Sequence, residues 1–358
     1  MIPFKALLIP LFLLASYTAE AQKRVPDEVM KQVYEEIKTP YKYGLVMVAG
    51  DSTKMADSPS VLRKGVSWYM SYIVFDGKGY ETWLAKSDDL LHWKTLGRIL
   101  SFTEDTWDAN QKAGYIALQD HTWSGSYKVG KFGGKYWMSY LGGASSGYEA
   151  GTLGIGMAST ANHTEVQEWK VLPRPVISSK DRDVRWYDNE TIFKSTVIRD
   201  KTKVLGYPFI MYYNARGSDP EKGHAPAERI AMAVSDDMVN WKRYGEAPVI
   251  DHRKGISGDA FITKMDSVWV MFYFGAFWKP QAFDRFACSY DLVNWTDWQG
   301  DDLVAPSEPY DSKYAHKPFV IKYKGVVYHF YCAVDKNDRR GIAVATSRDL
   351  GKSGLRFR

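Results

Sequence analysis

The sequence predicts an all-β fold, a five-bladed β-propeller preceded by a short N-terminal helix. A seven-residue pattern recurs along the chain, an aromatic strand precedes each copy, and the strands are not separated by amphipathic helices. Of the 358 residues, 45% are hydrophobic and 15% are aromatic, which is enough to form a large core. Four-stranded units repeated in this way favour a ring of blades.

The repeated pattern is clearest in "SDDLLHW" at Ser87 and "SDDMVNW" at Ser235. Looser copies complete a set of five matching serines: Ser87, Ser159, Ser235, Ser289 and Ser347. The serine and aspartate can close the turn after a third strand, and the tryptophan can pack between blades. We therefore interpret the pattern as a structural turn and not as a catalytic site.

Each copy follows a hairpin made of a shorter strand and an aromatic strand. The aromatic strands include "VSWYMSY" from Val66 and "VWVMFYF" from Val268. In the second unit this rule assigns the shorter, innermost strand to "SYKVGKFGG" from Ser126. A further strand-like segment after each serine motif completes four strands per blade.

The N-terminus reads as a secretory signal peptide over residues 1–21. Lys5 precedes an apolar run, and Ala19 and Ala21 form a small-residue cleavage site. Residues 22–42 form an N-terminal helical segment, and residues 43–358 form the propeller. We therefore expect a periplasmic or extracellular protein.

Composition argues against several other classes of protein. Net charge is +5, but basic and acidic residues are interspersed, so nucleic acid is not an expected partner. No later apolar run is long enough to span a membrane. Cys288 and Cys332 lie in apolar strands, where buried free thiols are expected. The oligomeric state is not indicated.

The inner strands of a propeller begin around one end of the central channel, so polar residues there converge on one pocket. Alignment of the hairpins places Asp57, Gly258 and His316 at one level, and Ser58, Asp259 and Lys317 at the next. Blade three leaves Asp188, Glu190 and Lys194 as alternatives, because the register of its inner strand is ambiguous. The assumed inner strand of blade two contributes His121 and Trp123.

The five blades, the segment "ADSPSV" followed by "WYMSY", and the repeated serine, aspartate and tryptophan turns resemble the five-bladed glycoside hydrolases. These are family 43 and its relatives in families 32, 62, 117 and 130. The resemblance covers almost everything from Tyr43 onward, and it implies hydrolysis of an oligosaccharide or polysaccharide. The family aspartate of blade one, a general base or nucleophile, is matched by Asp57, although Ser58 stands before Pro59. Blade four offers Asp259 where the family pattern has an acid glutamate.

Glycoside hydrolysis requires one carboxylic acid and one carboxylate, and a third carboxylate can keep the acid protonated. We expect Asp57 to be the base and Glu190 the acid, with Asp188 or Asp259 as modulator or acid. Glu81 and Glu149, in loops between second and third strands, are the fallback acids. Glu228 and Asp284 precede third strands and are expected at the rim.

The remaining polar and aromatic residues of these loops are expected to bind substrate. The predicted set is His316, Lys317, Lys194, Trp123, His121, Arg185, Glu81 and Glu149. The cations among them suggest an anionic sugar. No metal or other cofactor is expected, with calcium near the blade-five histidine of some relatives as the alternative.

Two other functions remain open at this point. An inverting phosphorylase of the family 130 kind would use the basic residues to hold phosphate. A non-catalytic propeller would bind glycans without needing the carboxyl groups. The sugar, the linkage, exo or endo action and the stereochemical outcome are not indicated by the sequence.

Overall fold

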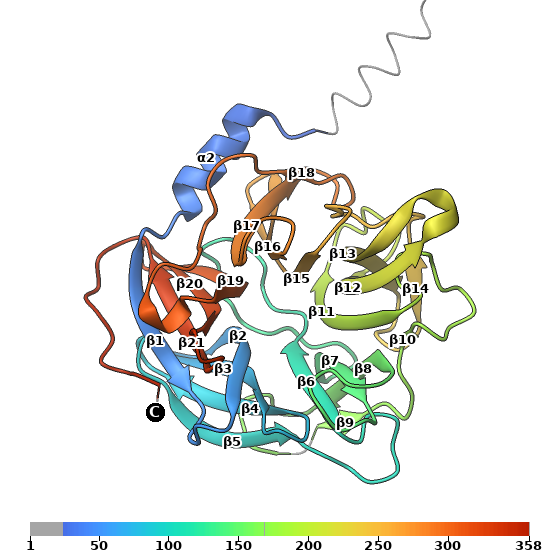
Figure 1. Cartoon of the computed structure of the whole chain (residues 1–358), viewed down its shortest axis with the longest axis horizontal. Coiled ribbons are helices and arrows are strands. Elements are labelled where there is room, and N and C mark those ends of the chain that lie inside the picture. The colour runs from blue at the N-terminus through green and yellow to red at the C-terminus, as the bar shows by residue number, and fades with distance from the viewer. Residues whose placement is uncertain (1–23, 168, 358) are drawn as a thin grey trace, which may run out of the picture.

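The computed structural model describes residues 24–357 except residue 168, so the predicted signal peptide lies outside the described residues. Five antiparallel blades surround a central channel (Figure 1), which confirms the all-β propeller. The first, third and fourth blades each run from an innermost to an outermost strand in chain order.

The strands of each blade are as follows. Blade one contains β2 (Met55–Lys64), β3 (Ser67–Phe75), β4 (Tyr80–Ser87) and β5 (Lys94–Leu100). Blade two contains β6 (Gln111–Ile116), β7 (Tyr136–Gly143), β8 (Leu153–Thr160) and the short β9 (Lys170–Val171) and β10 (Ile177–Ser178). Blade three contains β11 (Thr191–Arg199), β12 (Phe209–Asp219), η1 (Pro220–Lys222), β13 (His224–Ser235) and β14 (Trp241–Tyr244). Blade four contains β15 (Ile256–Met265), β16 (Val268–Ala276), β17 (Ala282–Ser289) and β18 (Thr296–Asp297). Blade five contains η2 (Pro309–Asp311), β19 (Tyr314–Tyr323), β20 (Val326–Val334), β21 (Arg340–Thr346) and β1 (Tyr41–Val48).

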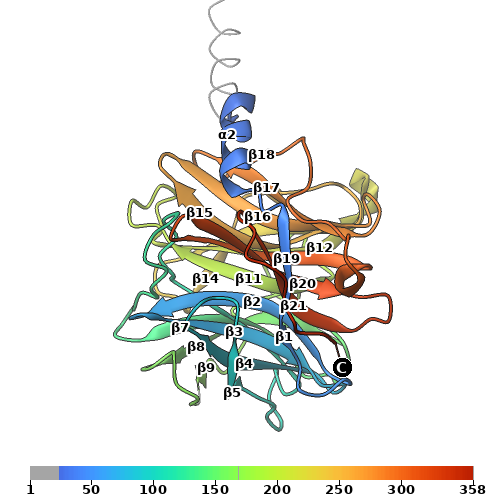
Figure 2. The same cartoon turned by 90° about the vertical axis from the view of Figure 1, so that its left-hand side faces the viewer.

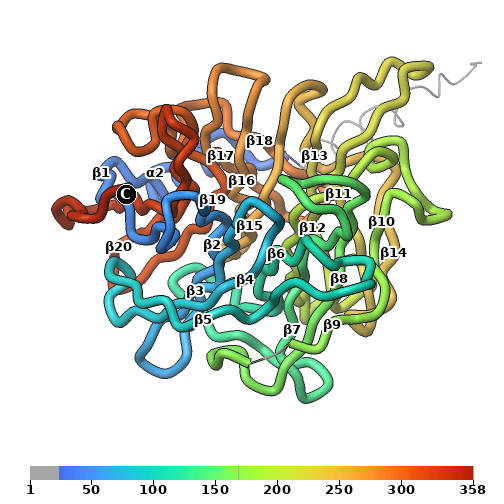
Figure 3. The backbone as a smooth tube through the Cα atoms, turned by 60° about the horizontal axis from the view of Figure 1, so that its bottom comes forward, coloured from blue at the N-terminus to red at the C-terminus, as the bar shows by residue number. Residues whose placement is uncertain are grey.

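Blade five is completed by the N-terminal strand. β1 pairs antiparallel with β21, with Tyr41 opposite Thr346, so the two ends of the propeller share one sheet. The C-terminal segment lies beside β1 (Figure 3), where the Ser353 amide donates to the carbonyl of Tyr43 at 2.7 Å. This pairing closes the ring and protects the edge of β21.

The expected N-terminal helix is α2 (Asp27–Ile37), which projects at one side of the propeller (Figure 2). It buries Met30, Val33 and Ile37, spaced three and four residues apart as one helical face requires. Tyr34 stacks on Trp298 with ring centroids 5.0 Å apart. The helix is therefore packed onto the propeller by its apolar face.

The repeated serine motif is a turn, as the sequence predicts. In blade three the Ser235 hydroxyl accepts from the amides of Asp237 and Met238, and the Asp237 carboxylate accepts from two further amides. Met238 adopts a left-handed conformation with φ of 66°. The Trp241 indole donates to the Met238 carbonyl at 3.1 Å. Blades one and four repeat the serine and indole bonds through Ser87 and Ser289.

The prediction for the inner strand of blade two is wrong. The innermost partner of β7 is β6, and the segment "SYKVGKFGG" makes only isolated bridges. Residues 117–135, between β6 and β7, instead run across the base of the channel. Their hydrogen bonds reach the other four blades, at Val61, Val197, Lys264 and Lys322. This segment blocks the end of the channel opposite the cavity described below.

Candidate active site

Four inner strands carry the same irregularity near their starts. In β11 the register shift falls between Ile192 and Ser195. In the other three strands, register shifts fall between Asp57 and Ser60 in β2, between Gly258 and Phe261 in β15, and between His316 and Phe319 in β19. These three are the levels that the sequence alignment predicts. Ser58, Asp259 and Lys317, one residue later, all have positive φ, between 46° and 65°. Each bulge therefore turns its side chains away from ordinary alternation.

The bulges lie beside a cavity of about 280 Å³. Carboxyl groups of Glu149, Glu228 and Asp259 line it, together with the cations Lys194, Lys317 and Arg340. Its apolar walls include rings from all five blades: Tyr80, Tyr115, Tyr148, Phe193, Phe274, Phe277 and Tyr314. A small apolar cavity with a few convergent polar groups is typical of a ligand site.

Asp57 lies against the cavity wall within a buried ion group. It is 2% exposed, and its Oδ2 accepts from Lys317 Nζ at 2.7 Å and from Arg340 Nη1 at 3.2 Å. Burial opposes ionisation, but Lys317 and Arg340 hold the pKa of Asp57 well below its usual range. Asp57 is therefore a fixed anion that orients two cations of the site.

The Asn214 side chain links carboxyl groups of blades three and four. Its Nδ2 donates to Glu228 Oε1 at 2.9 Å and to Asp259 Oδ1 at 2.8 Å, and its Oδ1 accepts from the Asp259 amide. The second oxygen of Asp259 lies 3.3 Å from Lys194 Nζ. Glu228 and Asp259 are thus held close together, with the cation on the Asp259 side.

Glu228 lies in β13, and the pKa of its carboxyl group is raised. The low-dielectric surroundings, with the nearby carboxylates of Glu149 and Asp259, raise its pKa to about 8. The carboxyl group is therefore largely protonated at neutral pH, as a general acid for glycoside cleavage must be.

Glu149 approaches the cavity from the loop between β7 and β8. Its Oε1 accepts from the Tyr80 hydroxyl at 3.3 Å. Burial raises its pKa, while Lys317 and Arg340 oppose that rise. The loop is fixed by the buried Gln111, whose amide donates to the carbonyls of Ser145 and Gly147.

His316 is buried at the blade-five wall of the cavity. Its Nδ1 lies 3.2 Å from the carbonyl of Cys332, so that nitrogen is the donor and Nε2 is left as an acceptor. Burial and the neighbouring Lys317 lower its pKa to about 3, and the ring is neutral. A neutral imidazole at this place can accept a hydrogen bond from a sugar hydroxyl.

The structure brings together six of the predicted site residues: Asp57, Asp259, His316, Lys317, Lys194 and Glu149. It places the others elsewhere. Glu190, predicted as the acid, lies outside the cavity at the start of blade three and pairs with the exposed Arg216 at 3.1 Å. The inner strand β11 begins at Thr191, so Glu190 lies just before the strand and not within it.

Asp188 and Arg185 also lie away from the cavity. Asp188 is fully buried behind blade three, where it accepts from Arg243 Nε at 2.5 Å and from Tyr213 at 2.9 Å. Arg185 pairs with Glu246 at 3.1 Å. Both residues are accounted for by structural ion pairs.

Glu81, His121 and Trp123 have structural contacts as well. Glu81 is buried in β4 and accepts from Arg98 and Ser101. His121 and Trp123 belong to the segment across the channel base, because the inner strand of blade two ends before them. His121 Nδ1 contacts the carbonyl of Ile262 at 2.9 Å, and Trp123 donates to Glu36 of α2 at 2.7 Å.

Sequence reasoning placed Glu228 at the rim and passed over Asn214, Tyr148 and Arg340. Arg340 begins β21, the third strand of blade five, so the rule that found Glu149 and Glu228 before third strands also points to it. Over residues 24–357 without residue 168, no cluster of three or more His, Cys, Asp or Glu side chains is arranged to hold a metal ion. In the same residues no helix is long and apolar enough to cross a membrane.

Neither protein-family models nor curated proteins give a match to this sequence. Solved structures, in contrast, give matches over most of the protein. One described as a "Glycoside hydrolase" is 50% identical, covers 94% of this protein and 99% of its own length, and has a TM-score of 0.91. Another, described as a complex of BT0996 and RGII, has the same identity and TM-score over 93% and 99%. A thermostable family-43 glycoside hydrolase is 16% identical, with a TM-score of 0.59 over 86% and 93%, and shares the fold.

The propeller fold is shared with solved glycoside hydrolases, a class of enzymes that cleave glycosidic bonds. With half of its residues identical to a solved glycoside hydrolase over nearly the full length of both proteins, the protein belongs to the glycoside hydrolases. It is a glycosidase, and its substrate is a glycan.

Proposed function

We propose that the protein removes a terminal sugar from an oligosaccharide, with Glu228 as general acid and Glu149 as the partner carboxylate. The observation that carries this proposal is a cavity-lining Glu228 with a pKa of about 8 beside two other carboxyl groups. Glu149 is the better anion of the pair, because Lys317 and Arg340 both favour its ionised form. Glu228, with its pKa of about 8, is therefore assigned the proton near pH 7.

In the reaction, Glu228 gives its proton to the glycosidic oxygen while the bond from that oxygen to the anomeric carbon breaks. Glu149 either takes a proton from the attacking water or bonds to the anomeric carbon before water does so; the separation of the two carboxyl groups decides between these routes. Asp259, held by Asn214 and Lys194, maintains the negative potential that keeps Glu228 protonated. These assignments replace Asp57 as base and Glu190 as acid.

Exo action is supported by the closed form of the site. The cavity volume of about 280 Å³ is at the small end of the range for ligand sites, which suits one or two sugar rings. The segment 117–135 blocks the other end of the channel, so a continuous polysaccharide cannot pass through. One relative at 50% identity is described as a complex with RGII, and we propose a glycan of that kind as substrate.

The charges of the cavity favour a neutral terminal sugar. Lys194, Lys317 and Arg340 face three carboxylates, those of Asp57, Asp259 and Glu149, once Glu228 holds its proton. An anionic sugar would disturb this balance. We further propose that the enzyme acts without a metal and is secreted after cleavage near Ala21, which N-terminal sequencing of the mature protein tests.

The experiment compares Glu228→Gln and Glu149→Gln with wild type on aryl glycosides and on oligosaccharides derived from RGII. We expect each variant to lose roughly a hundredfold to ten-thousandfold in kcat. Glu190→Gln is the matched control, because this exposed glutamate lies outside the cavity, and it should stay near wild type. Equal activity with and without phosphate argues for hydrolysis over phosphorolysis. Full activity of Glu228→Gln would overturn the assignment.

A further inference from the structure

The loop between β16 and β17, residues 277–281, presents one unusual aromatic residue to the cavity. Phe277 lines the cavity, yet the residue is 60% exposed. Its φ of 64° lies in the left-handed region, which is rare for a residue with a bulky side chain. A strained and exposed aromatic residue beside a ligand site calls for a functional explanation.

The residues that follow Phe277 anchor the loop. The Trp278 indole donates to the Ile256 carbonyl at 2.9 Å, and its ring stacks on His252 with centroids 4.0 Å apart and an interplanar angle of 3°. Lys279 Nζ lies 2.5 Å from both oxygens of Asp302. Gln281 donates to the carbonyl of Ser312 in blade five at 3.0 Å.

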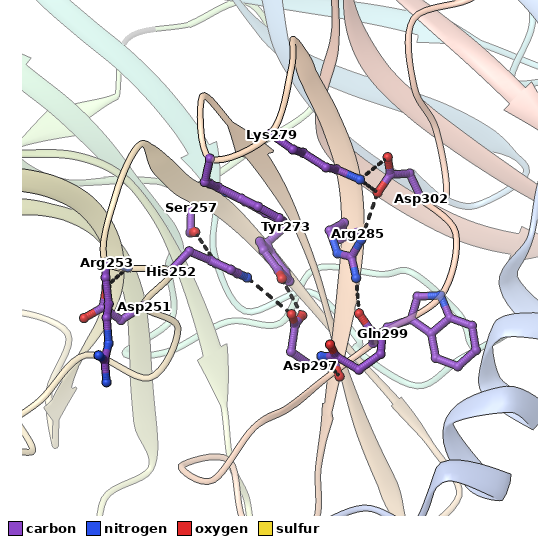
Figure 4. A network of polar contacts seen from close by, with 12 residues as sticks. Asp251, His252, Arg253, Ser257, Tyr273, Lys279, Arg285, Asp297, Gln299 and Asp302 are labelled. Atoms are coloured by element: carbon purple, nitrogen blue, oxygen red, sulfur yellow. Dashed lines mark hydrogen bonds and ion pairs between the residues drawn. The ribbon is translucent and has the colours of Figure 1, made fainter.

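A second layer of polar contacts holds these anchors (Figure 4). His252 lies between Ser257 and Asp297, with its Nδ1 2.8 Å from the serine hydroxyl and its Nε2 3.3 Å from the carboxylate. Asp297 also accepts from Tyr273, and Asp302 accepts from Arg285 at 3.0 Å. The loop is therefore rigid, and its backbone strain is offset by contacts that do not involve the Phe277 ring.

The Phe277 ring itself has little internal packing. Its ring contact is an edge-on approach to Tyr314, with centroids 6.2 Å apart. A face of the aromatic ring is consequently available to a ligand at the cavity mouth. Aromatic rings in such positions bind the apolar face of a sugar ring and lose little conformational entropy on binding.

We propose that Phe277 is a specificity-determining residue, a platform for the sugar ring on the leaving-group side of the scissile bond. This rests on the proposed function, because a terminal sugar in the closed cavity directs its leaving group outward to the mouth. Phe277 then contacts a ring-shaped leaving group and not a small one such as methanol. The substrate is accordingly a terminal sugar linked to a second sugar ring.

The test uses a disaccharide and the methyl glycoside of the terminal sugar that wild type releases fastest. For Phe277→Ala we expect kcat/KM on the disaccharide to fall about tenfold, and on the methyl glycoside to stay within about twofold. Phe277→Trp should retain the disaccharide rate. Phe277→Gly, which accepts the positive φ without strain, should behave like Phe277→Ala. Equal losses on both substrates, or no loss, would overturn the platform.

Tyr290→Ala is the control, since this exposed aromatic residue lies on the β17–β18 turn and does not line the cavity. It should change neither rate. If wild type releases no sugar from any glycan tested, the proposed function has failed, and the platform is then tested by calorimetric binding of a disaccharide derived from RGII. Weaker binding to Phe277→Ala supports the platform, and unchanged binding rejects it.

Discussion

Asn214 shows how one side chain controls the chemistry of several others. Its amide nitrogen has two protons and donates them to Glu228 and Asp259, so a neutral side chain fixes both carboxyl groups. A lysine or arginine in that position would favour ionisation of Glu228. The hydrogen bond from Asn214 also lowers the pKa of Glu228, but burial and the carboxylates of Glu149 and Asp259 outweigh it, so the proton stays on Glu228.

The pH dependence of hydrolysis follows from this arrangement. Since the pKa of Glu228 is raised to about 8, the group loses its proton as pH rises through that value, and kcat/KM should fall on the alkaline side there. Asp259→Asn removes a neighbouring negative charge, so the alkaline limb should move to lower pH as overall activity drops. Initial rates from pH 5 to 10 check this. If the alkaline limb of Asp259→Asn stays at the wild-type pH, the group whose ionisation causes that limb is not Glu228.

Asp57 should contribute to stability, because its removal leaves Lys317 and Arg340 buried without their anion. We expect Asp57→Asn to lower the free energy of unfolding by roughly 3–5 kcal/mol near pH 7. The lowered pKa of Asp57 means that its contribution is complete above the unfolded value of about 4 and declines as pH falls further toward the folded value.

Denaturant unfolding of wild type and Asp57→Asn at pH 7 and pH 3 measures both effects. The exposed Asp301→Asn serves as control and should change stability by less than about 0.5 kcal/mol. A difference between wild type and Asp57→Asn that grows at low pH would contradict the ion-pair explanation.

Part of the site could be located from the sequence, because the repeated hairpins show which inner-strand residues of different blades lie at the same height along the channel. Asp57, Asp259, His316 and Lys317 lie near the start of hairpins that have the same length in three blades, so alignment places them together. Glu149 and Glu228 are positioned by longer hairpins of individual length, and a sequence records no distance between them. The position of Glu190 outside the cavity could not be foreseen, because nothing in "DNETIF" marks the residue at which the strand begins.

At the scale of elements, the serine turns of blades one, three and four share the same set of hydrogen bonds. In blade three, Asp237 fixes the amides of Val239 and Asn240 and receives the Asn240 side chain. We expect Asp237→Ala to destabilise the protein by about 1–2 kcal/mol, since the turn amides lose their acceptor. Asp236→Ala, at the exposed neighbouring residue, should be nearly neutral. Thermal unfolding of both variants decides whether the motif is structural, and hydrolysis should be unchanged in each.

Blade two shows where pattern reasoning fails for a whole element. β6 reads "QKAGYI" and has six residues, whereas the other inner strands have nine or ten, so it lacks their long strand pattern. The later segment "SYKVGKFGG" has turn glycines and stands directly before an aromatic strand, so it imitates the inner hairpin of a blade. Its contacts with the other blades are long-range, and no local preference encodes them.

At the scale of the whole molecule, the pairing of β1 with β21 closes the ring of blades, and residues 117–135 lie across one end of its channel. β1 completes blade five, while residues 117–135 join all the blades across the base. Opposite this base, the bulges of β2, β15 and β19 place Asp57, Asp259, His316 and Lys317 at or beside the cavity. The same ring therefore carries the segment 117–135 at one end of the channel and the cavity at the other, and it brings Asp57 and Lys317, 260 positions apart in sequence, into one ion group.

Closure by β1 leads to a prediction about truncation from the N-terminus. A truncated protein that starts at Pro40 keeps β1 but loses α2, together with its buried Met30, Val33 and Ile37. It should fold and hydrolyse substrate with a lower midpoint of thermal unfolding. A protein that starts at Asp51 lacks β1, so β21 becomes an exposed edge strand and the C-terminal segment loses its partners at Tyr43 and Leu45. Such an edge favours aggregation. We expect this shorter form to be insoluble or to lack a cooperative unfolding transition; cooperative unfolding with full activity would show that the blade-five seam does not hold the ring together.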